Sequence, residues 1–402
     1  MLMNFSFKRS IQEFSVNHCL KSMDGILFKR FVLSMFAVFL FGAAYSQTDG
    51  RKDLSLMLVG DIMLGTHFPS EKYLPAGDDP LPLIEAAIPV LTSADVTIGN
   101  LEGSYLDEGE LVKRCKDTTK CYAFKTPVRY APVLKESGFD IFSVANNHIR
   151  DFGEAGMLST SHVLDSLGIR YAGFVSRPYD TLTVNGKLVG FCAFSPNAGT
   201  VQITDIPGAE EIVRHLDSVC DYVIVSFHGG AEGEKYQHIT RETEEFYGEN
   251  RGNVYEFAHK MIDAGADVVF GHGPHVARAV EVYKGHFIAY SLGNFCTYGR
   301  FNLRGANGLA PAVEVLLDEN GEFIEGKIHS FRQEKATGVH ADPLNSAALK
   351  IKDLTTADFP ELRDRLVIDE EGNVFTMFAH KLKTLGLQNP ASSIPVPDII
   401  AD

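Results

Sequence analysis

The chain has 402 residues, of which 45% are hydrophobic and 22% are charged, and its formal net charge is −15 at pH 7. This length and composition are typical of a globular protein with one large domain or two. The acidic balance argues against nucleic-acid binding and against docking on anionic lipid by charge alone.

Residues 1–46 have the pattern of a secretory signal. Two basic residues precede the apolar run 31–41, and Ala44-Tyr45-Ser46 follows it with small residues one position apart. The apolar run is too short for a comfortable membrane span. We therefore expect an exported protein, periplasmic or at the cell surface. The alternative is an N-terminal membrane anchor that is not cleaved.

In the first half of the mature chain, strands alternate with helices, and three strands end in polar side chains. Strands are predicted over 54–61, 95–102 and 139–148. Helices are predicted over 80–91, 128–137 and 154–167. The strands end at Asp61, at Glu102 and at the pair Asn147 and His148, so each places polar groups at its carboxyl end.

The second half continues the alternation and then becomes strand-rich. Strands are predicted over 169–174, 181–184, 187–194, 222–228, 266–270 and 286–291, with a hairpin over 312–317 and 323–331. Helices are predicted over 209–218 and 253–264. The polar stretch 231–251 is interpreted as a long loop or lid. Alternation followed by strands indicates an α/β core with a mixed sheet or a second sheet.

The stretch around His272 and His275 combines a buried strand with a constrained loop. Residues 266–270 are small or apolar, which suits a strand buried on both faces. Gly271 and Gly273 free the backbone to turn sharply. Two imidazoles held by a rigid loop are a ready half of a metal site, because imidazole is a common metal ligand. The alternative is a pair of surface histidines.

The chemistry-bearing residues share one position in the fold. Asp61, Glu102, Asn147, His228 and His272 each lie just past the carboxyl end of a predicted strand. In open α/β folds, ligands bind at that edge of the sheet. We therefore expect residues that are far apart in sequence to converge there.

An ordered set of six motifs carries a family resemblance. The motifs are Gly60-Asp61, Asn100-Leu-Glu102, Asn146-Asn-His148 with Asp151 and Gly153, Ser226-Phe-His228, Gly271-His-Gly-Pro-His275 and Ser291-Leu-Gly-Asn294. In this order they resemble the CapA family of capsule (poly-γ-glutamate) synthesis, within the calcineurin-like metallophosphoesterase superfamily. The resemblance covers residues 54–300. It implies a four-layer αββα sandwich with a two-metal centre.

The resemblance also assigns roles to individual residues. It implies two divalent metal ions, of Mn, Zn or Fe, held by Asp61, Glu102, Asn147, His228, His272 and His275. It implies that His148 contacts the leaving group. Asp151 would orient that imidazole, or it would be the N-cap of the helix predicted from 154. Asn294 is interpreted as a turn-capping amide, with direct catalysis as the alternative.

Three departures from the superfamily pattern bear on the metal and the substrate. The first motif normally carries a histidine where this chain has Met63. The second motif has Glu102, which would have to bridge the metals, as the CapA family arranges it. An aromatic residue often follows the histidine of the fourth motif, but here Gly229-Gly230 and a long polar insert follow.

Two divalent cations would clamp both the attacking and the leaving oxygen of a phosphoryl displacement. We therefore expect a metal-dependent hydrolase acting on phosphoester or amide bonds of a capsule or envelope polymer. The expected partners are an anionic polymer or a phosphoester substrate and membrane subunits of polymer synthesis, with no nucleic acid. The alternatives are a non-catalytic subunit that binds polymer in the same cleft, a scavenger of nucleotides or phosphosugars, and a degenerate, metal-free site.

Two expectations concern the remaining chain. Cys115 and Cys121 flank a polar loop, and an exported protein favours a local disulfide there. Residues 301–402 are expected to add strands and helices that pack on the same core. Within them, 349–354 and 358–367 have an amphipathic pattern.

Overall fold

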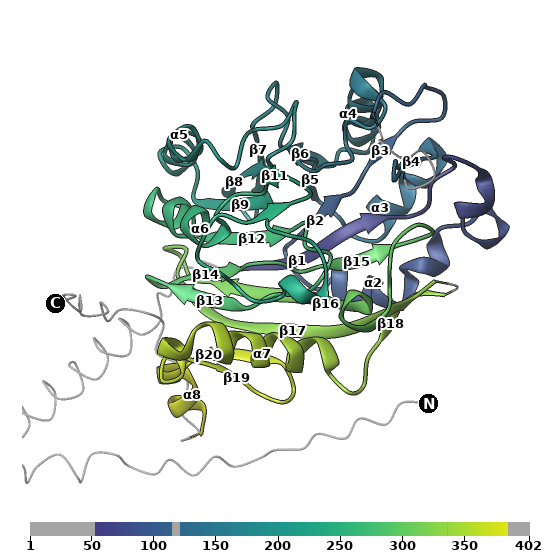
Figure 1. Ribbon diagram of the computed structural model, residues 1–402. Coiled ribbons are helices and arrows are strands. Elements are labelled where there is room, and N and C mark those ends of the chain that lie inside the picture. Colours follow the sequence, from purple (N-terminus) through teal and green to yellow (C-terminus); the bar gives the residue numbers. More distant parts are fainter. Residues whose placement is uncertain (1–52, 115–120, 336, 385–402) are drawn as a thin grey trace, which may run out of the picture. The chain divides into compact units, whose positions relative to one another are not determined.

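The computed structural model describes residues 53–114, 121–335 and 337–384, and two β-sheets form the centre of this part of the chain (Figure 1). The ten-stranded sheet contains β1 (Leu54–Met63), β2 (Val96–Leu101), β5 (Ile141–Ser143), β6 (Arg170–Ala172), β15 (Asn294–Thr297), β16 (Leu309–Leu317), β17 (Phe323–Glu334), β18 (Gly338–Ala341), β19 (Leu366–Ile368) and β20 (Asn373–Thr376). Its order is β19-β20-β17-β16-β1-β2-β5-β6, with β15 beside β1 and β18 beside β17. The predicted signal over 1–46 lies outside the described residues.

The six-stranded sheet has the order β13-β14-β12-β9-β8-β7. Its strands are β7 (Tyr179–Val184), β8 (Lys187–Phe194), β9 (Tyr222–His228), β12 (Val268–His272), β13 (Val280–Tyr283) and β14 (His286–Ala289). Two short ribbons pair β3 (Ser104–Tyr105) with β4 (Lys125–Thr126) and β10 (Glu245–Phe246) with β11 (Glu249–Asn250). Strands β1, β2 and β5 run parallel, as do β8, β9 and β12.

Most of the helices cover the outer faces of the two sheets (Figure 1). They are α2 (Ile88–Leu91), α3 (Pro132–Glu136), α4 (Gly153–Leu167), α5 (Ile206–Asp217), α6 (Val254–Asp263), α7 (Ser346–Asp358) and α8 (Met377–Thr384). Helices α5 and α6 pack on β8, β9 and β12, while α2, α3 and α4 share an apolar core with the ten-stranded sheet. Helix α7 instead packs against β16 and β17 of one sheet and β13 of the other, at the edge of the core between them. Within the described ranges, no helix has both the length and the hydrophobicity that a membrane span requires.

Strand β1 shows how the sequence builds the layers. Leu56 and Leu58 belong to the core between the two sheets, whereas Met57 and Val59 belong to the core beneath α2, α3 and α4. Successive side chains of a strand point to opposite faces, so an unbroken apolar run supplies both cores. The chain therefore forms the expected αββα sandwich, with helices outside and two sheets inside.

Several predicted elements are shorter than expected, including the helix predicted over 128–137, which is a 3-10 turn over Val128–Tyr130 followed by the short α3. The segment 80–91 is broken into two 3-10 turns and the short α2, because Pro82 and Pro89 lack the backbone N–H that a continuous helix needs. The predicted strand 139–148 keeps only Ile141–Ser143 as β5. Asn146 Oδ1 accepts from the backbone N–H groups of His148 and Ile149, at 3.1 and 2.9 Å, which turns the chain early.

Candidate metal centre

Both sheets contribute the ends of neighbouring strands to one site. On the ten-stranded sheet, Asp61 is the register partner of Asn100 on β2 and of Asn294 on β15. On the six-stranded sheet, His228 is the register partner of His272. All five side chains are fully buried. The predicted convergence at the carboxyl ends of strands therefore occurs, across the seam between the two sheets.

The motif glycines allow the backbone to approach closely at this seam. A Cβ atom at Gly60 would lie 1.9 Å from the carbonyl oxygen of Gly293, whose own φ is +62°. That contact accompanies a 2.9 Å hydrogen bond from the backbone N–H of Asp61 to the same oxygen. Any side chain at 60 would push Asp61 away from β15.

A single amide holds the two carboxylates together. Asn100 Nδ2 donates to Asp61 Oδ1 at 2.8 Å and to Glu102 Oε2 at 2.6 Å. Burial, and then the nearby charge of Asp61, raise the pKa of Glu102 to about 8. The pair is therefore under electrostatic strain that a cation between the carboxylates would relieve.

The two strand-end imidazoles face each other. His228 Nδ1 lies 3.1 Å from His272 Nδ1, and His272 Nε2 lies 3.0 Å from Ser226 Oγ. Burial lowers the pKa of His272 to about 4 and holds the pKa of His228 well below its ordinary value. Both rings are therefore neutral near pH 7, which is the form that binds a metal.

Asp61, His228 and His272 form one compact ligand group. One donor atom from each lies within 4.8 Å of the others. His272 Nδ1 is 3.8 Å from Asp61 Oδ1, and His228 Nδ1 is 3.7 Å from Glu102 Oε2. Glu102 therefore lies at the edge of the same group.

His275 approaches Asp61 from the loop after β12. Its φ is +58°, and its Nδ1 lies 2.8 Å from Asp61 Oδ2. Its carbonyl oxygen accepts from Asn294 Nδ2 at 3.2 Å and from Asn307 Nδ2 at 3.0 Å. Burial opposes protonation of His275, but the hydrogen bond and charge of Asp61 outweigh it and raise its pKa to about 9. Asn294 thus holds this backbone through its amide nitrogen.

The donor set fits divalent metal ions. Among the described residues, the buried polar atoms without a hydrogen-bond partner include four from this centre: Glu102 Oε1, Asn147 Oδ1, His228 Nε2 and Asn294 Oδ1. A buried polar atom left unpaired costs about 1–3 kcal/mol, so native proteins rarely keep several in one place. Carboxylate, amide and imidazole are the ligand types that Mn, Zn and Fe accept.

A second polar group lies beside this centre. His148 Nδ1 is 2.7 Å from Asp151 Oδ2, and its Nε2 is 4.0 Å from Glu102 Oε1. Lys113 Nζ pairs with Asp151 Oδ1 at 2.9 Å. Burial, and then the charge of Lys113, lower the pKa of His148.

The N-cap alternative for Asp151 is wrong. Helix α4 begins at Gly153, its N-cap is Phe152, and no side chain caps it. The Asp151 carboxylate is already used, because Oδ2 also accepts from the backbone N–H of Phe124 at 3.0 Å. Asp151 therefore fixes the His148 ring and the strand ribbon beside it.

Met63, at the position where the resemblance led us to expect a histidine, lies in an apolar wall. It is buried together with Phe124 and Phe301. The Phe124 ring stacks on Phe301 at 4.8 Å and lies 4.1 Å from the His148 ring. This wall excludes water from one side of His148.

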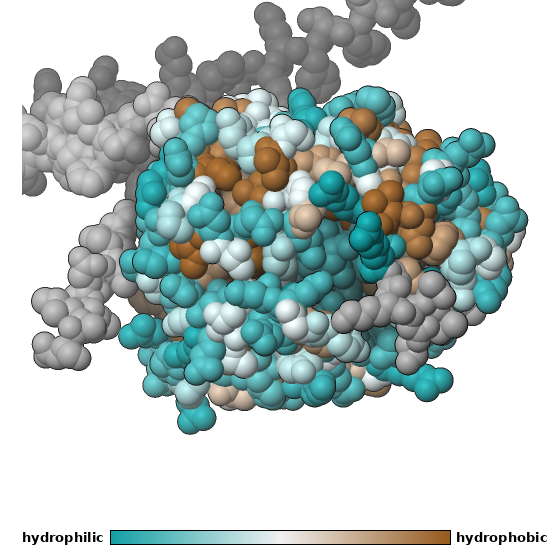
Figure 2. Space-filling view, turned by 45° about the horizontal axis from the view of Figure 1, so that its top comes forward, coloured by the Kyte–Doolittle hydropathy of each residue, from teal (hydrophilic) through white to brown (hydrophobic). Residues whose placement is uncertain are grey.

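A cavity of about 410 Å³ opens beside these residues. It is lined by Asn147, His148 and His275, and also by residues of the polar insert such as Tyr247 and Arg251. The space-filling view shows a hydrophilic hollow flanked by hydrophobic residues on one face (Figure 2). The predicted loop 231–251 therefore contributes directly to the wall of the cavity, with β10 and β11 within it.

Three contributors were not identified as site residues from the sequence. Ser226 could have been, because it precedes His228 by two positions on one strand and therefore shares its face. Lys113 comes from a loop and Asn307 from a 3-10 turn over Gly305–Gly308, and neither segment has a recognisable pattern. Cys121 is disulfide-bonded, and its predicted partner Cys115 lies outside the described residues.

Comparison with known proteins places the chain in a family. A family model described as "Bacterial capsule synthesis protein PGA_cap" matches residues 55–298. The "Capsule biosynthesis protein CapA" of Bacillus anthracis is 28% identical over 292 residues, which are 66% of this chain and 67% of that protein. The "PGA biosynthesis protein CapA" of Bacillus subtilis (strain 168) is 30% identical over 262 residues, 60% of this chain and 63% of that protein.

A solved structure, the 5'-nucleotidase precursor from Thermus thermophilus, is 12% identical with a TM-score of 0.41 and covers 78% of this chain and 61% of that one. The family model spans more than half of the chain and includes both strand-end histidines and both carboxylates of the buried centre. The chain therefore belongs to the bacterial capsule synthesis protein family.

Proposed function

We propose that this chain is an exported, metal-dependent hydrolase that cleaves phosphoester or amide bonds of an anionic envelope polymer. The observation that carries the proposal is the buried cluster of Asp61, His228 and His272, whose donor atoms lie within 4.8 Å of one another and come from two separate sheets. Two buried atoms of this group, His228 Nε2 and the adjoining Glu102 Oε1, have no hydrogen-bond partner among the described residues, and such atoms are costly to bury unless something binds them. The family membership supports the choice of a capsule polymer as the substrate class.

The proposed ligands of two divalent metal ions are Asp61, Glu102, Asn147, His228, His272 and His275. When bound, such ions lower the pKa of water and neutralise charge on a reacting oxygen. Glu102 is the proposed bridging group, because Asn100 holds its Oε2 beside Asp61 while its Oε1 has no hydrogen-bond partner among the described residues.

His148 is the proposed general acid for the leaving group. Asp151 accepts the Nδ1 proton, so Nε2 carries a proton to transfer only when the imidazole is protonated, a form that burial and Lys113 oppose and that Asp151 favours. Phe124 and the rest of the apolar wall keep water from the ring, and Lys113 neutralises Asp151. Together these groups hold the imidazole in one orientation at the cavity wall.

The test is metal content together with turnover. Protein purified without added metal is analysed for bound Mn, Zn and Fe, and then assayed on phosphoesters and on γ-glutamyl amides. We expect bound metal and hydrolysis of one of these bond types, both lost on treatment with a chelator. Full hydrolytic activity in metal-free protein would rule the proposal out.

A second candidate is a non-catalytic subunit that binds the polymer in the same cleft. The observation that favours it is Met63, which packs against Phe124 and Phe301 and leaves the centre one imidazole short of the superfamily pattern. In that case the purified protein would retain polymer and metal without turning over either class of bond.

A further inference from the structure

A second cavity adjoins the metal cleft. It has a volume of about 710 Å³ and shares Tyr122, Arg300, Phe301 and Asn302 with the smaller cavity beside His148. Since four residues line both spaces, the two cavities are neighbours, and an extended ligand that follows this shared wall would meet both. Nothing in the catalytic proposal uses this second space.

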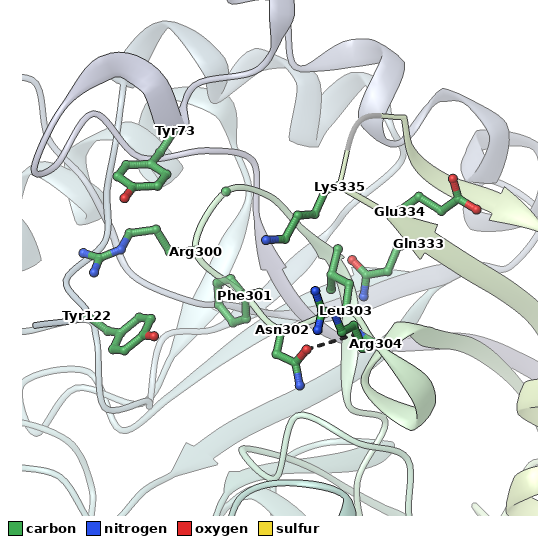
Figure 3. Close-up of a pocket in the computed structure, with 11 residues that line it drawn as sticks. Tyr73, Tyr122, Arg300, Phe301, Asn302, Leu303, Arg304, Gln333, Glu334 and Lys335 are labelled. Atoms are coloured by element: carbon green, nitrogen blue, oxygen red, sulfur yellow. Dashed lines mark hydrogen bonds between the residues drawn. The ribbon is translucent and has the colours of Figure 1, made fainter. Parts of the chain in front are cut away.

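The second cavity is basic, although the chain as a whole has a net charge of −15. Arg300, Arg304 and Lys335 line it, and none of them forms an ion pair with a carboxylate among the described residues. Figure 3 shows the Lys335 side chain extending toward the loop that carries Arg300, while the carboxylate of Glu334 points away. Three cations in one hollow, none of them in an ion pair with a described carboxylate, indicate an anionic ligand.

Arg300 is held in place before any ligand arrives. Its Nη1 donates to the Cys121 carbonyl at 2.6 Å, and its guanidinium lies 4.7 Å from the Tyr122 ring and 5.4 Å from the Tyr73 ring. The guanidinium has five N–H donors, so most remain for a ligand. Gly299, at φ +92°, brings this loop close to the Tyr73 backbone, with only 3.1 Å between its would-be Cβ and the Tyr73 oxygen.

We propose that this cavity is a binding subsite for carboxylate groups along an anionic polymer, one end of which enters the metal cleft. Arginine binds carboxylates through paired hydrogen bonds, and lysine adds a mobile point charge. Three separate cations match a ligand with repeated negative charges better than a single anion. The inference rests on the proposed function for the polymer's entry into the cleft, but binding in the cavity requires no turnover.

The test measures binding of labelled poly-γ-glutamate to the full chain by fluorescence anisotropy, after chelation of metal. The variant Arg304→Ala/Lys335→Ala removes two exposed cations of the cavity. The control Lys260→Ala/Arg363→Ala removes one lysine and one arginine that are exposed, unpaired with any described carboxylate, and outside both cavities. Melting temperatures confirm that both variants are folded.

We expect a roughly three- to tenfold rise in Kd for the cavity variant and none for the control, because each exposed ion pair contributes modestly. The difference should shrink as salt is raised, since these charges are screened. Equal Kd values for wild type and cavity variant, or no binding of the polymer at all, would overturn the subsite. Tighter binding of polyphosphate than of poly-γ-glutamate would overturn the carboxylate assignment.

The outcome is separable from that of the proposed hydrolase. If the chelated protein binds polymer in a manner that depends on Arg304 and Lys335, while no preparation hydrolyses anything, the subsite stands and the hydrolase fails. If hydrolysis is metal-dependent but the cavity variant binds like wild type, the hydrolase stands and the subsite fails.

Discussion

His228 and His272 end adjacent parallel strands as register partners, and their Nδ1 atoms lie 3.1 Å apart. Two neutral imidazole nitrogens can approach this closely only if one carries the proton that the other accepts. Ser226 also competes for a proton, because its hydroxyl lies 3.0 Å from His272 Nε2. A metal ion would give the facing nitrogens a common partner.

The variant His228→Ala should lose bound metal. Second-shell changes alone weaken metal binding about 10–100-fold, so loss of a direct ligand should cost at least as much. Elemental analysis after dialysis against a fixed metal concentration measures the loss. His259→Ala is the control, because that imidazole lies outside the site and its Nε2 is hydrogen-bonded to Glu281 Oε2 at 3.0 Å. Wild-type metal content in His228→Ala would contradict the ligand assignment.

The variant His148→Ala should keep its metal but lose turnover. General acid catalysis contributes about 10²–10⁴-fold, so kcat should fall in that range on a substrate with a poor leaving group. The loss should be much smaller on a nitrophenyl ester, whose leaving group needs no proton. Asp151→Asn should show the same leaving-group pattern with a smaller loss. An equal loss on both substrates would exclude the acid role.

Metal binding at pH 7 should release protons. In the metal-free protein, the pKa of Glu102 is raised to about 8, by burial and then by Asp61. The pKa of His275 is raised to about 9, because burial lowers it less than the hydrogen bond to Asp61 and the charge of Asp61 raise it. Metal would displace protons from both groups. Calorimetry in buffers of different ionisation enthalpy counts the protons, and Glu102→Gln should release fewer. Metal uptake without proton release would contradict these shifts.

The same shifts set the sign of a stability change in metal-free protein. Both folded pKa values lie above the ordinary values of 4.5 and 6.5. The folded state therefore holds more protons than the unfolded state, and the free energy of unfolding falls as pH rises from about 6.5 to about 9. Melting curves with chelator should show this fall, and saturating metal should reduce it. A free energy of unfolding that does not change with pH in the presence of chelator would show that folding raises the pKa of neither Glu102 nor His275.

A buried ion pair anchors the polar insert over the cavity. Arg278 donates to both carboxylate oxygens of Glu244 at 2.8 Å, and their side chains are 0% and 5% exposed. The variant Arg278→Met should destabilise the protein by about 3–5 kcal/mol, because it leaves Glu244 buried without its partner. Denaturant unfolding measures the change. The double variant Arg278→Met/Glu244→Leu should recover most of the loss; no recovery would mean that packing, not charge, holds the insert.

Local sequence was sufficient to predict the strands that carry the site. Apolar runs ended by polar residues predicted β1, β9 and β12, because burial on both faces leaves a continuous hydrophobic pattern. Prediction from local sequence failed where single residues override the hydrophobic pattern. Pro82 and Pro89 interrupt a predicted helix, and the side chain of Asn146 ends a predicted strand early. The ordered motifs also predicted the family, which the profile match over 55–298 confirms.

What the sequence alone determined was which residue types stand at the ends of strands, since periodicity and turn residues are local. Only the tertiary structure decided that Asn100 joins Asp61 to Glu102, that Met63 packs in an apolar wall, and that Arg300 lines two neighbouring cavities. These relationships depend on strand register and on the stacking of two sheets. Both are fixed by contacts between residues far apart in the chain, which no local pattern encodes.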